Sequence, residues 1–185
     1  LALVACQVGM FDGHYCLSEA FMGEGDINDP KGAIGVMGPT TNSPYGAADS
    51  LVKWIFKGYF QEDIHHMGAV TDWSKNEVFE YYGSSGIDNN HMHMIFGCPE
   101  FDIFTDTGPL VHLEADHWSN IQPGPWGVTV TASDSPREGV MVGVVQNDIL
   151  LESGFTNVDG VVNFDIPTIP TNDEVTITCT LHNFY

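Results

Sequence analysis

The sequence predicts an α/β layer with a mostly parallel sheet, followed by a small all-β sandwich. Two short apolar runs at 1–5 and 33–37 indicate strands buried on both faces, which is typical of parallel sheets. An apolar stripe of helical period follows over 47–60. After Thr107 only short segments remain, several alternating at period two and separated by turns. We therefore expect an α/β domain over 1–107 and a β-sandwich over 108–185.

The elements of the first domain follow in a simple order. Besides the two strands, helical turns are expected at 18–22 and 78–82, and a strand at 92–96. The helix over 47–60 has the clearest pattern. Its apolar residues recur at helical spacing along one stripe: Leu51, Val52, Ile55, Phe56, Tyr59 and Phe60.

Six short strands are expected in the second domain. They cover 111–115, 128–132, 140–145, 148–151, 161–166 and 175–181. Turn sequences such as Pro-Gly-Pro and Asp159-Gly160 separate them. No helical pattern remains, which favours two packed sheets.

Acidic residues dominate the charge of this 185-residue chain. Asp and Glu number 25 against 5 Lys and Arg, a formal charge of −20, shared as 4 − 15 = −11 before residue 108 and 1 − 10 = −9 after it. Five cations cannot form the basic surface that a nucleic acid or an anionic membrane requires. No apolar run reaches the length of a membrane span. The acidic surface and the low lysine content favour a secreted or cell-surface protein.

Both ends of the sequence lie inside apolar runs, LALVAC and VTITCTLHNFY, so we expect a processed or partial chain. The four cysteines show neither a CxxC pair nor zinc-finger spacing. They are too scattered for a disulfide scaffold, and the pairing of any two stays open.

Cys6 is the sharpest candidate for chemistry. It ends the first apolar run and opens a glycine-containing loop, and sites in open α/β sheets form beyond the carboxyl ends of strands. A thiol there becomes a nucleophile when a histidine lowers its pKa or takes its proton. Two alternatives are a small buried apolar residue and a lipoprotein cleavage box over 3–6, which needs a longer apolar region before it.

The residues around Cys6 resemble the nucleophile segment of the gingipain-type cysteine peptidases. The matching pattern is Val4-Ala5-Cys6, then Gly9 and Phe11, then Cys16-Leu-Ser-Glu-Ala-Phe-Met22. Residues 32–38 are similar to the family's next core strand, and 40–45 to the loop that walls its substrate pocket. Phe96-Gly97-Cys98-Pro99 is similar to a Phe-Gly-Asp-Pro sequence that ends the catalytic domain.

This resemblance implies a partial caspase-like domain followed by an immunoglobulin-like sandwich. It implies that Cys6 is the nucleophile and that the general base is a histidine of a Gly-His-Gly loop, upstream of Leu1 or supplied in trans. The oxyanion would bind the Cys6 N–H and a donor of that loop. Pocket candidates are Gln7, Thr41, Asn42 and Tyr45. Two departures are the replacement of an Asn-Gly-Asp loop by residues 7–10 and of the aspartate before Pro99 by Cys98.

Other polar groups have weaker patterns. His14 follows in the loop after Cys6 and is either a substitute base or a surface residue. His91 and His93 would share one face of a strand and could hold a transition metal, or they mark a half-exposed strand edge. No cofactor is expected, except that Glu24, Asp26 and Asp29 could chelate Ca²⁺; a solvated turn is the alternative.

Three functions follow from these observations. The first is a fragment of a secreted, gingipain-like cysteine endopeptidase, whose partners are a polypeptide substrate and the upstream catalytic segment. The second is an extracellular structural subunit that forms homo-oligomers or fibres by strand addition, with 175–185 as the donor strand. The third is a non-catalytic adhesion module. The first leaves this chain inactive by itself, because the base lies outside it.

Overall fold

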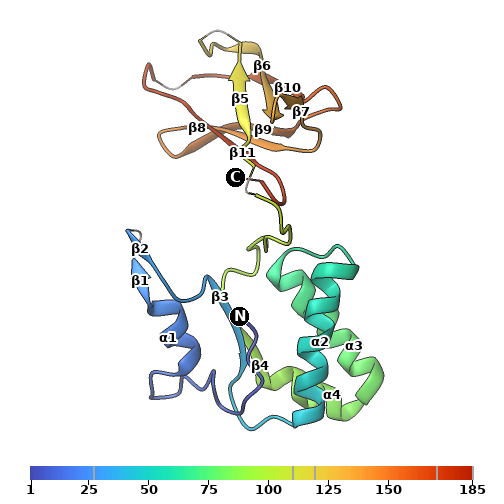
Figure 1. The fold of residues 1–185 in the computed structure, drawn as a ribbon. Helices are drawn as coiled ribbons and strands as arrows, with labels where there is room; N and C mark the ends of the chain where they lie inside the picture. Colours follow the sequence, from blue (N-terminus) through green and yellow to red (C-terminus); the bar gives the residue numbers. More distant parts are fainter. Residues whose placement is uncertain (27, 110, 119, 170, 185) are drawn as a thin grey trace. The chain divides into compact units, whose positions relative to one another are not determined.

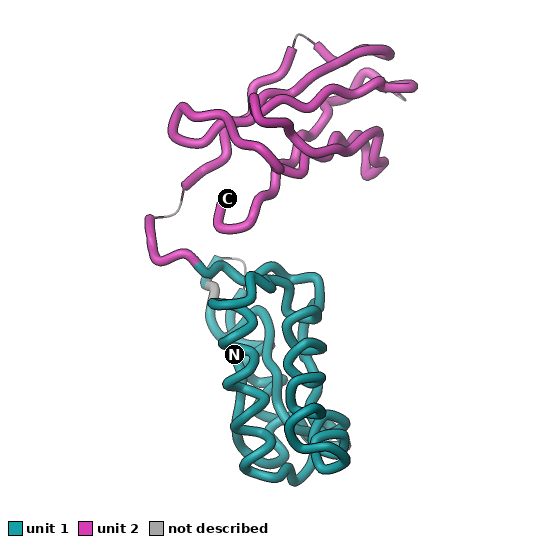
Figure 2. The backbone as a smooth tube through the Cα atoms, turned by 90° about the vertical axis from the view of Figure 1, so that its right-hand side faces the viewer, with its two compact units in different colours: residues 1–105 teal, residues 106–185 magenta. Residues whose placement is uncertain are grey.

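The computed structural model describes residues 1–26, 28–109, 111–118, 120–169 and 171–184. The chain divides into two compact units, Leu1–Thr105 and Asp106–Tyr185, which we call unit 1 and unit 2 (Figure 2). Unit 1 combines helices with a small sheet, whereas unit 2 contains strands and, among its described residues, no helix. The prediction of a mixed α/β fold is confirmed.

The sheet of unit 1 is built around β3 (Gly35–Pro39), all of whose residues are buried. On one side β3 pairs antiparallel with β4 (His93–Gly97). On the other side residues 1–3 run parallel to it: Leu3 N–H donates to the Met37 carbonyl at 2.9 Å, and Met37 N–H donates to the first residue's carbonyl at 2.8 Å. The strand that carries Cys6 at its end is therefore tied to the middle of the sheet.

Two expectations about this sheet are wrong. The sheet is not mostly parallel, because β4 runs against β3. The chain between them forms two long helices, α2 (Tyr45–Gln61) and α3 (Met67–Tyr82), and the short helix α4 (Ser84–Met92), and it re-enters at the end where β3 finished, where Pro39 pairs with His93. A single crossover helix would have given a parallel pair. Residues 1–5 are also not buried on both faces, since Leu1 and Val4 are 54% and 38% exposed.

Helices α2 and α3 pack against β3 and against each other. Their core consists of seven buried residues: Met37, Ala47, Leu51, Ile55, Met67, Val70 and Val78. The rings of Trp54 and Trp73 meet edge to face at 5.9 Å across the two helices. The predicted helix over 47–60 is thus confirmed, but its stripe is not all core: Phe56 and Phe60 are 56% and 62% exposed and stack on one another.

Helix α3 is far longer than the single turn expected at 78–82. Its length was not predicted because polar residues lie on its buried face. Thr71 and Ser74 are buried, and their hydroxyls donate to the carbonyls four residues earlier, of Met67 at 2.7 Å and Val70 at 2.6 Å. These bonds satisfy the hydroxyls inside the helix itself. Buried Thr and Ser therefore interrupt the apolar period by which a helix is identified in sequence.

Shorter elements complete unit 1. Figure 1 shows α1 (Leu17–Gly23) and the hairpin of β1 (Gly25–Asp26) and β2 (Asp29–Pro30) on one side of β3 and β4. Helices α2, α3 and α4 (Ser84–Met92) lie on the other side. This two-sided cover explains why every residue of β3 is buried.

Unit 2 consists of two antiparallel sheets. The first has the order β10 (Val161–Ile166), β6 (Gly124–Ala132), β5 (Glu114–His117), with β7 (Ser135–Pro136) paired to the end of β6. The second has the order β11 (Thr176–Thr180), β8 (Met141–Gln146), β9 (Ile149–Phe155). Valines that alternate along β6 and β8 form the core between the sheets: Val128, Val130, Val142 and Val144. The alternation of apolar and polar residues predicted these strands because each strand buries only one of its faces.

None of the helices that the structure describes combines the length and the apolarity needed to cross a membrane.

The contrast between the two halves of the α2 stripe can be tested by truncation. Leu51 is 0% exposed, so we expect Leu51→Ala to lower the free energy of unfolding of unit 1 by about 3 kcal/mol. Phe56→Ala, from the exposed half of the same helix, should cost less than about 1 kcal/mol. Urea titration followed by tryptophan fluorescence measures both. Equal losses would show that the stripe is buried along its whole length.

Candidate active site

Cys6 lies directly beyond the segment that pairs with β3. Its side chain is exposed and its thiol is free. The Sγ atom lies 3.7 Å from the carbonyl oxygen of Ser43, in the loop that leads from β3 to α2. The strand end, the thiol and this loop therefore meet at one end of the sheet.

The turn after Cys6 is fixed by backbone hydrogen bonds to the chain that continues β3. Gln7 N–H donates to the Thr41 carbonyl at 3.2 Å, and Gly9 N–H donates to the Pro39 carbonyl at 2.9 Å. Gln7 adopts a φ of 62°, a left-handed conformation that non-glycine residues rarely adopt. The Cys6 N–H, in contrast, has no hydrogen-bond partner among the described residues.

Helix α1 holds the same turn from the other side. Ser18 is fully buried, and both its hydroxyl and its N–H donate to the Val8 carbonyl, at 3.0 Å and 2.9 Å. The start of α1 is itself capped, since Cys16 N–H donates to the Glu19 carboxylate at 2.9 Å. The turn that carries Cys6 is thus clamped between β3 and α1.

The structure brings the predicted pocket residues into this neighbourhood. Gln7 and Thr41 are joined by their backbone bond, Asn42 lies in the same loop, and Tyr45 begins α2. All four are exposed, Tyr45 by 78%. Neither of the two hollows described below includes any of them.

No histidine among the described residues forms a hydrogen bond with the Cys6 thiol. His14 lies in the exposed loop before α1, and its predicted role as a substitute base stays a prediction. The structure supplies an exposed thiol and a loop beside it. Among the described residues it supplies no imidazole bonded to that thiol.

His91 and His93 do not share the face of a strand. His91 is exposed in the last turn of α4, whereas His93 is the first residue of β4 and only 1% exposed. No helix was expected here, but α4 extends to Met92, so the strand begins only at His93. Within the described residues, no three His, Cys, Asp or Glu side chains converge as metal ligands.

His93 is a buried imidazole. Its Nδ1 donates a hydrogen bond to the Asn89 carbonyl at 2.8 Å, while Nε2 is buried with no hydrogen-bond partner among the described residues. Lys75 donates to the His93 carbonyl at 2.9 Å. Burial, and to a lesser extent the nearby Lys75 charge, lower the pKa of His93 below its ordinary value, so the ring is neutral at pH 7.

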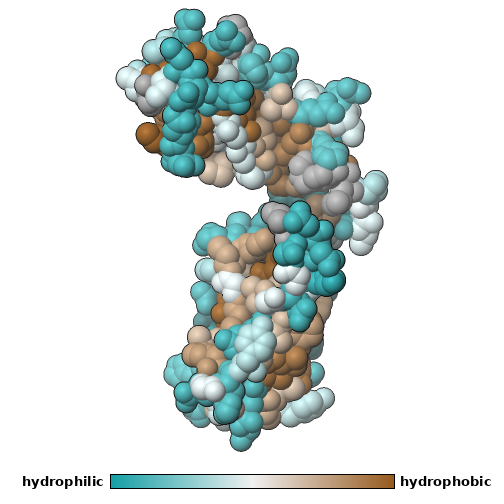
Figure 3. All heavy atoms as spheres, turned by 90° about the vertical axis from the view of Figure 1, so that its left-hand side faces the viewer, coloured by the Kyte–Doolittle hydropathy of each residue, from teal (hydrophilic) through white to brown (hydrophobic). Residues whose placement is uncertain are grey.

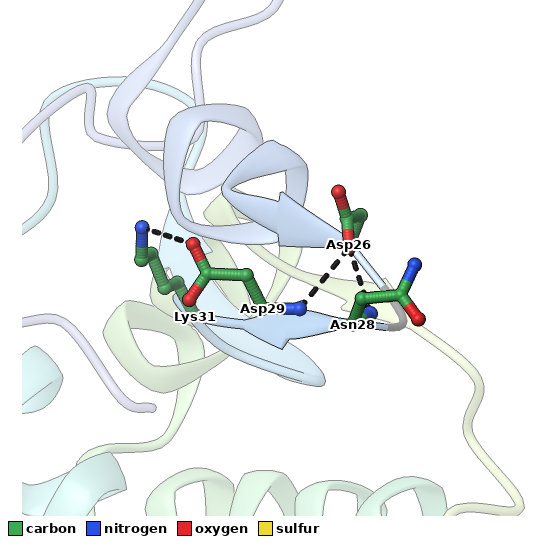
Figure 4. A network of polar contacts seen from close by, with 4 residues as sticks. All are labelled: Asp26, Asn28, Asp29 and Lys31. Atoms are coloured by element: carbon green, nitrogen blue, oxygen red, sulfur yellow. Dashed lines mark hydrogen bonds and ion pairs between the residues drawn. The ribbon is translucent and has the colours of Figure 1, made fainter.

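The acidic cluster predicted as a Ca²⁺ site lies at the β1–β2 hairpin (Figure 4). The Asp26 carboxylate accepts the N–H groups of Asn28 at 2.7 Å and Asp29 at 3.1 Å. The Asp29 carboxylate pairs with Lys31 at 2.5 Å. These carboxylates are already used in the turn, and Ca²⁺ binding stays a prediction.

Unit 1 also contains an apolar hollow of about 520 Å³, between the first strand and α2. Leu1, Ile34, Phe56 and Phe60, each more than half exposed, lie along it. Tyr59 lines it too, and burial raises the pKa of that phenol to about 12. Hydrophobic groups also appear among hydrophilic ones on the surface seen in Figure 3.

Two site residues escaped sequence reasoning. Ser18 is buried in a helix that the sequence predicted only as helical turns at 18–22, and Ser43 contributes only a backbone carbonyl. A serine in an apolar helical pattern was the one signal for Ser18. A carbonyl contact leaves no signal in the side-chain sequence.

Comparison with known proteins gives a family match over the first unit. Residues 1–104 match the sequence profile of peptidase family C25. No curated protein matches the chain.

Solved structures share the fold over nearly the whole chain. The Arg-specific cysteine proteinase gingipain R has a TM-score of 0.83 at 17% identity, over 99% of this chain and 42% of its own. A complex of Porphyromonas gingivalis RgpB pro- and mature domains has a TM-score of 0.78 at 18% identity, over 98% and 43%. A structure described as a protease has 0.72 at 14%, over 99% and 44%. The chain thus spans about two fifths of their length, and identities this low show the fold alone.

The clamp on the Cys6 turn can be tested at Gly9. A methyl group there would lie 2.9 Å from the Phe96 ring and 3.1 Å from the Gly38 carbonyl, both of which are packed. We expect Gly9→Ala to cost about 1–3 kcal/mol of unit 1 stability. Gly46→Ala, in the exposed first turn of α2, meets only the Tyr82 hydroxyl at 3.7 Å and should be neutral or stabilising. If urea titration finds the two variants equally stable, the turn is not closely packed.

The buried His93 should make unit 1 weaker in acid. Its folded pKa is lowered, so the unfolded chain binds the proton first and stability falls as pH drops below about 6.5. Between pH 7.5 and 5.5 we expect a loss of up to about 1.4 kcal/mol that His93→Gln removes. His14→Gln, in an exposed loop, should retain it. An NMR titration in which His93 protonates at an ordinary pKa would contradict this account.

Proposed function

Because this chain belongs to peptidase family C25, we propose that it is the nucleophile-bearing part of a secreted cysteine endopeptidase of gingipain type. The observation that carries the proposal is the exposed, free Cys6 thiol on a turn clamped between β3 and α1. A nucleophile needs both properties, since it must reach the substrate and be held in one position. The substrate is a polypeptide.

The proposed chemistry is acyl transfer through Cys6. The thiolate attacks the scissile carbonyl carbon, an S–C bond forms, and the carbonyl electron pair moves to the oxygen. The Cys6 N–H, which has no other partner among the described residues, is one donor to that oxyanion. The C–N bond then breaks, the leaving amine takes a proton from an imidazolium, and water hydrolyses the thioester to restore the thiol.

We propose that the imidazole comes from outside these 185 residues. Among the described histidines none is bonded to Cys6, and His93 is buried and held by Asn89. We place the general base on a segment upstream of Leu1 or on a partner chain. By itself, the 185-residue chain is then inactive as a peptidase.

The loop beside Cys6 forms one wall of the proposed substrate pocket. Thr41 and Asn42 present exposed polar groups, and the Tyr45 ring is 78% exposed at the start of α2. Exposed rings and amides of this kind bind an extended peptide by stacking and hydrogen bonding. The Gln7 N–H donates to the Thr41 carbonyl and so joins this loop to the turn that carries Cys6.

We place unit 2 among the immunoglobulin-like sandwiches. Support comes from two packed antiparallel sheets around a valine core within about 80 residues. Its acidic surface agrees with a secreted protein. The alternative of a self-assembling fibre finds some support in the edge strands β5 and β11, but a charge of −20 on every copy opposes association.

Cys6 and Cys98 form a matched pair for testing the peptidase proposal, since both are exposed free thiols. In the 185-residue chain we expect iodoacetamide to label them at similar rates. When a family C25 catalytic segment bearing Gly-His-Gly is added, Cys6 should react about tenfold faster than Cys98, because the imidazole raises its thiolate fraction. Mass spectrometry of the labelled peptides measures the ratio.

The control is the same segment with its histidine changed to alanine, which should bind without accelerating the reaction. Co-elution in size-exclusion chromatography shows that the segment is bound. If Cys6 in the bound complex labels no faster than Cys98, the chain is not the nucleophile-bearing part. The adhesion module, in contrast, predicts that Cys6→Ala changes no property of the complex.

A further inference from the structure

Unit 2 contains a hollow of about 640 Å³ that is lined by residues of both sheets and by the chain at 120–123, 169 and 171–175. The sheets contact each other along β9 and β10, which end the strand order on one side. On the other side β5 and β11 are the edge strands, and each pairs with a single neighbour among the described residues. The hollow is lined from both, by His117 of β5 and by Ile177 of β11. Among the described residues no further strand pairs with β5 or β11 at the edges that border this hollow.

The inner wall of this hollow is aromatic and aliphatic. Trp126 is 5% exposed, with its ring 6.4 Å from that of Phe164 and 5.8 Å from the imidazole of His117. Ile121 and Ile177 line the same space and are only half buried, although both pack against the core of unit 2. Apolar side chains left half covered next to a free strand edge are typical of a surface that another strand covers.

The rim of the hollow is acidic and is held in place from inside. Gln146 is 1% exposed, and its amide donates to the carbonyls of Thr171 at 3.1 Å and Asp173 at 2.8 Å. The Asp173 carboxylate accepts Asn147 Nδ2 at 3.0 Å and the Thr171 hydroxyl at 2.7 Å. These two bonds lower the pKa of Asp173, so it stays ionised. Glu174 follows it on the same rim.

Charge decides what could occupy the hollow. Residues 106–185 contain 11 Asp and Glu and a single cation, Arg137, which gives 1 − 11 = −10. The Arg137 guanidinium lies 5.0 Å from the Phe184 ring, and neither residue lines the hollow. No Lys or Arg is therefore present among its described lining residues to neutralise Asp173 and Glu174. A basic occupant is attracted, and a second copy of this acidic chain is repelled.

We propose that this hollow binds an extended, basic polypeptide segment that adds as a strand to the free edge of β11. Its backbone would extend the β9–β8–β11 sheet, and its inward side chains would cover Trp126 and Ile177. Lysine or arginine side chains at the rim would pair with Asp173 and Glu174. This function belongs to unit 2 and does not depend on Cys6 or on peptidase activity.

The test uses the whole chain and two fluorescein-labelled probes, an octapeptide of alternating valine and lysine and its valine–glutamate counterpart. Fluorescence anisotropy at about 50 mM salt should show binding of the lysine probe only, weakening as salt screens the rim. The double variant D173N/E174Q should weaken binding about fivefold or more. The matched control E138Q/D159N removes two exposed charges elsewhere in unit 2 and should stay within about twofold. Circular dichroism shows that both variants are folded.

Two further readouts separate this binding mode from general charge attraction. Ile177→Ala, which keeps the charge but removes part of the wall, should also weaken the lysine probe. Backbone amides of Thr176–Thr180 should gain protection from hydrogen exchange when the probe binds. The proposal is overturned if the glutamate probe binds equally well, if the control variant loses as much affinity as D173N/E174Q, or if exchange in β11 does not change.

Discussion

The parallel pairing of residues 1–3 with β3 is the interaction on which the candidate active site depends. It places the strand end beside the loop that leaves β3, and the bonds from Gln7 to Thr41 and from Gly9 to Pro39 continue it past the strand. Without those bonds Cys6 would be an exposed thiol on a segment with no fixed position. With them its sulfur has a fixed neighbour, the Ser43 carbonyl. Position rather than exposure is therefore what the fold contributes to this cysteine.

The same clamp explains why small residues occur around the turn. At Gly9 and Gly38 an added methyl group would come within 3.0 Å of side chains that pack there, of Phe96 and Val8. The turn can approach β3 only because both positions lack a Cβ. Ser18 closes the third side with a hydroxyl in place of an apolar group. The rigidity of the turn thus comes from close backbone approach and not from a large side-chain core.

Sequence reasoning succeeded where one face of an element is apolar and failed where polar groups are buried. The strands of unit 2, helix α2 and membership of the peptidase family, the last through the residues around Cys6, were predicted and are confirmed. Helix α3 was missed because the buried hydroxyls of Thr71 and Ser74, which are satisfied inside the helix, interrupt its apolar pattern. The direction of β4 was missed because it depends on the helices between β3 and β4, and α3 is one of them. The role of His93 could not be predicted, because the sequence does not distinguish a histidine that is buried and neutral from one that binds a metal.

The negative charge of both units determines which other chains they attract and which they repel. Each unit carries −10, since residues 1–105 contain 14 acidic residues against 4 lysines, and residues 106–185 contain 11 against one arginine. Association between copies must overcome that repulsion, whereas a basic polypeptide is attracted to either unit. In unit 1 the cationic side chains of Lys53 and Lys57 already lie over the Trp54 ring. In unit 2 no such cation lies along the open hollow among its described residues, so the unmet attraction is concentrated there.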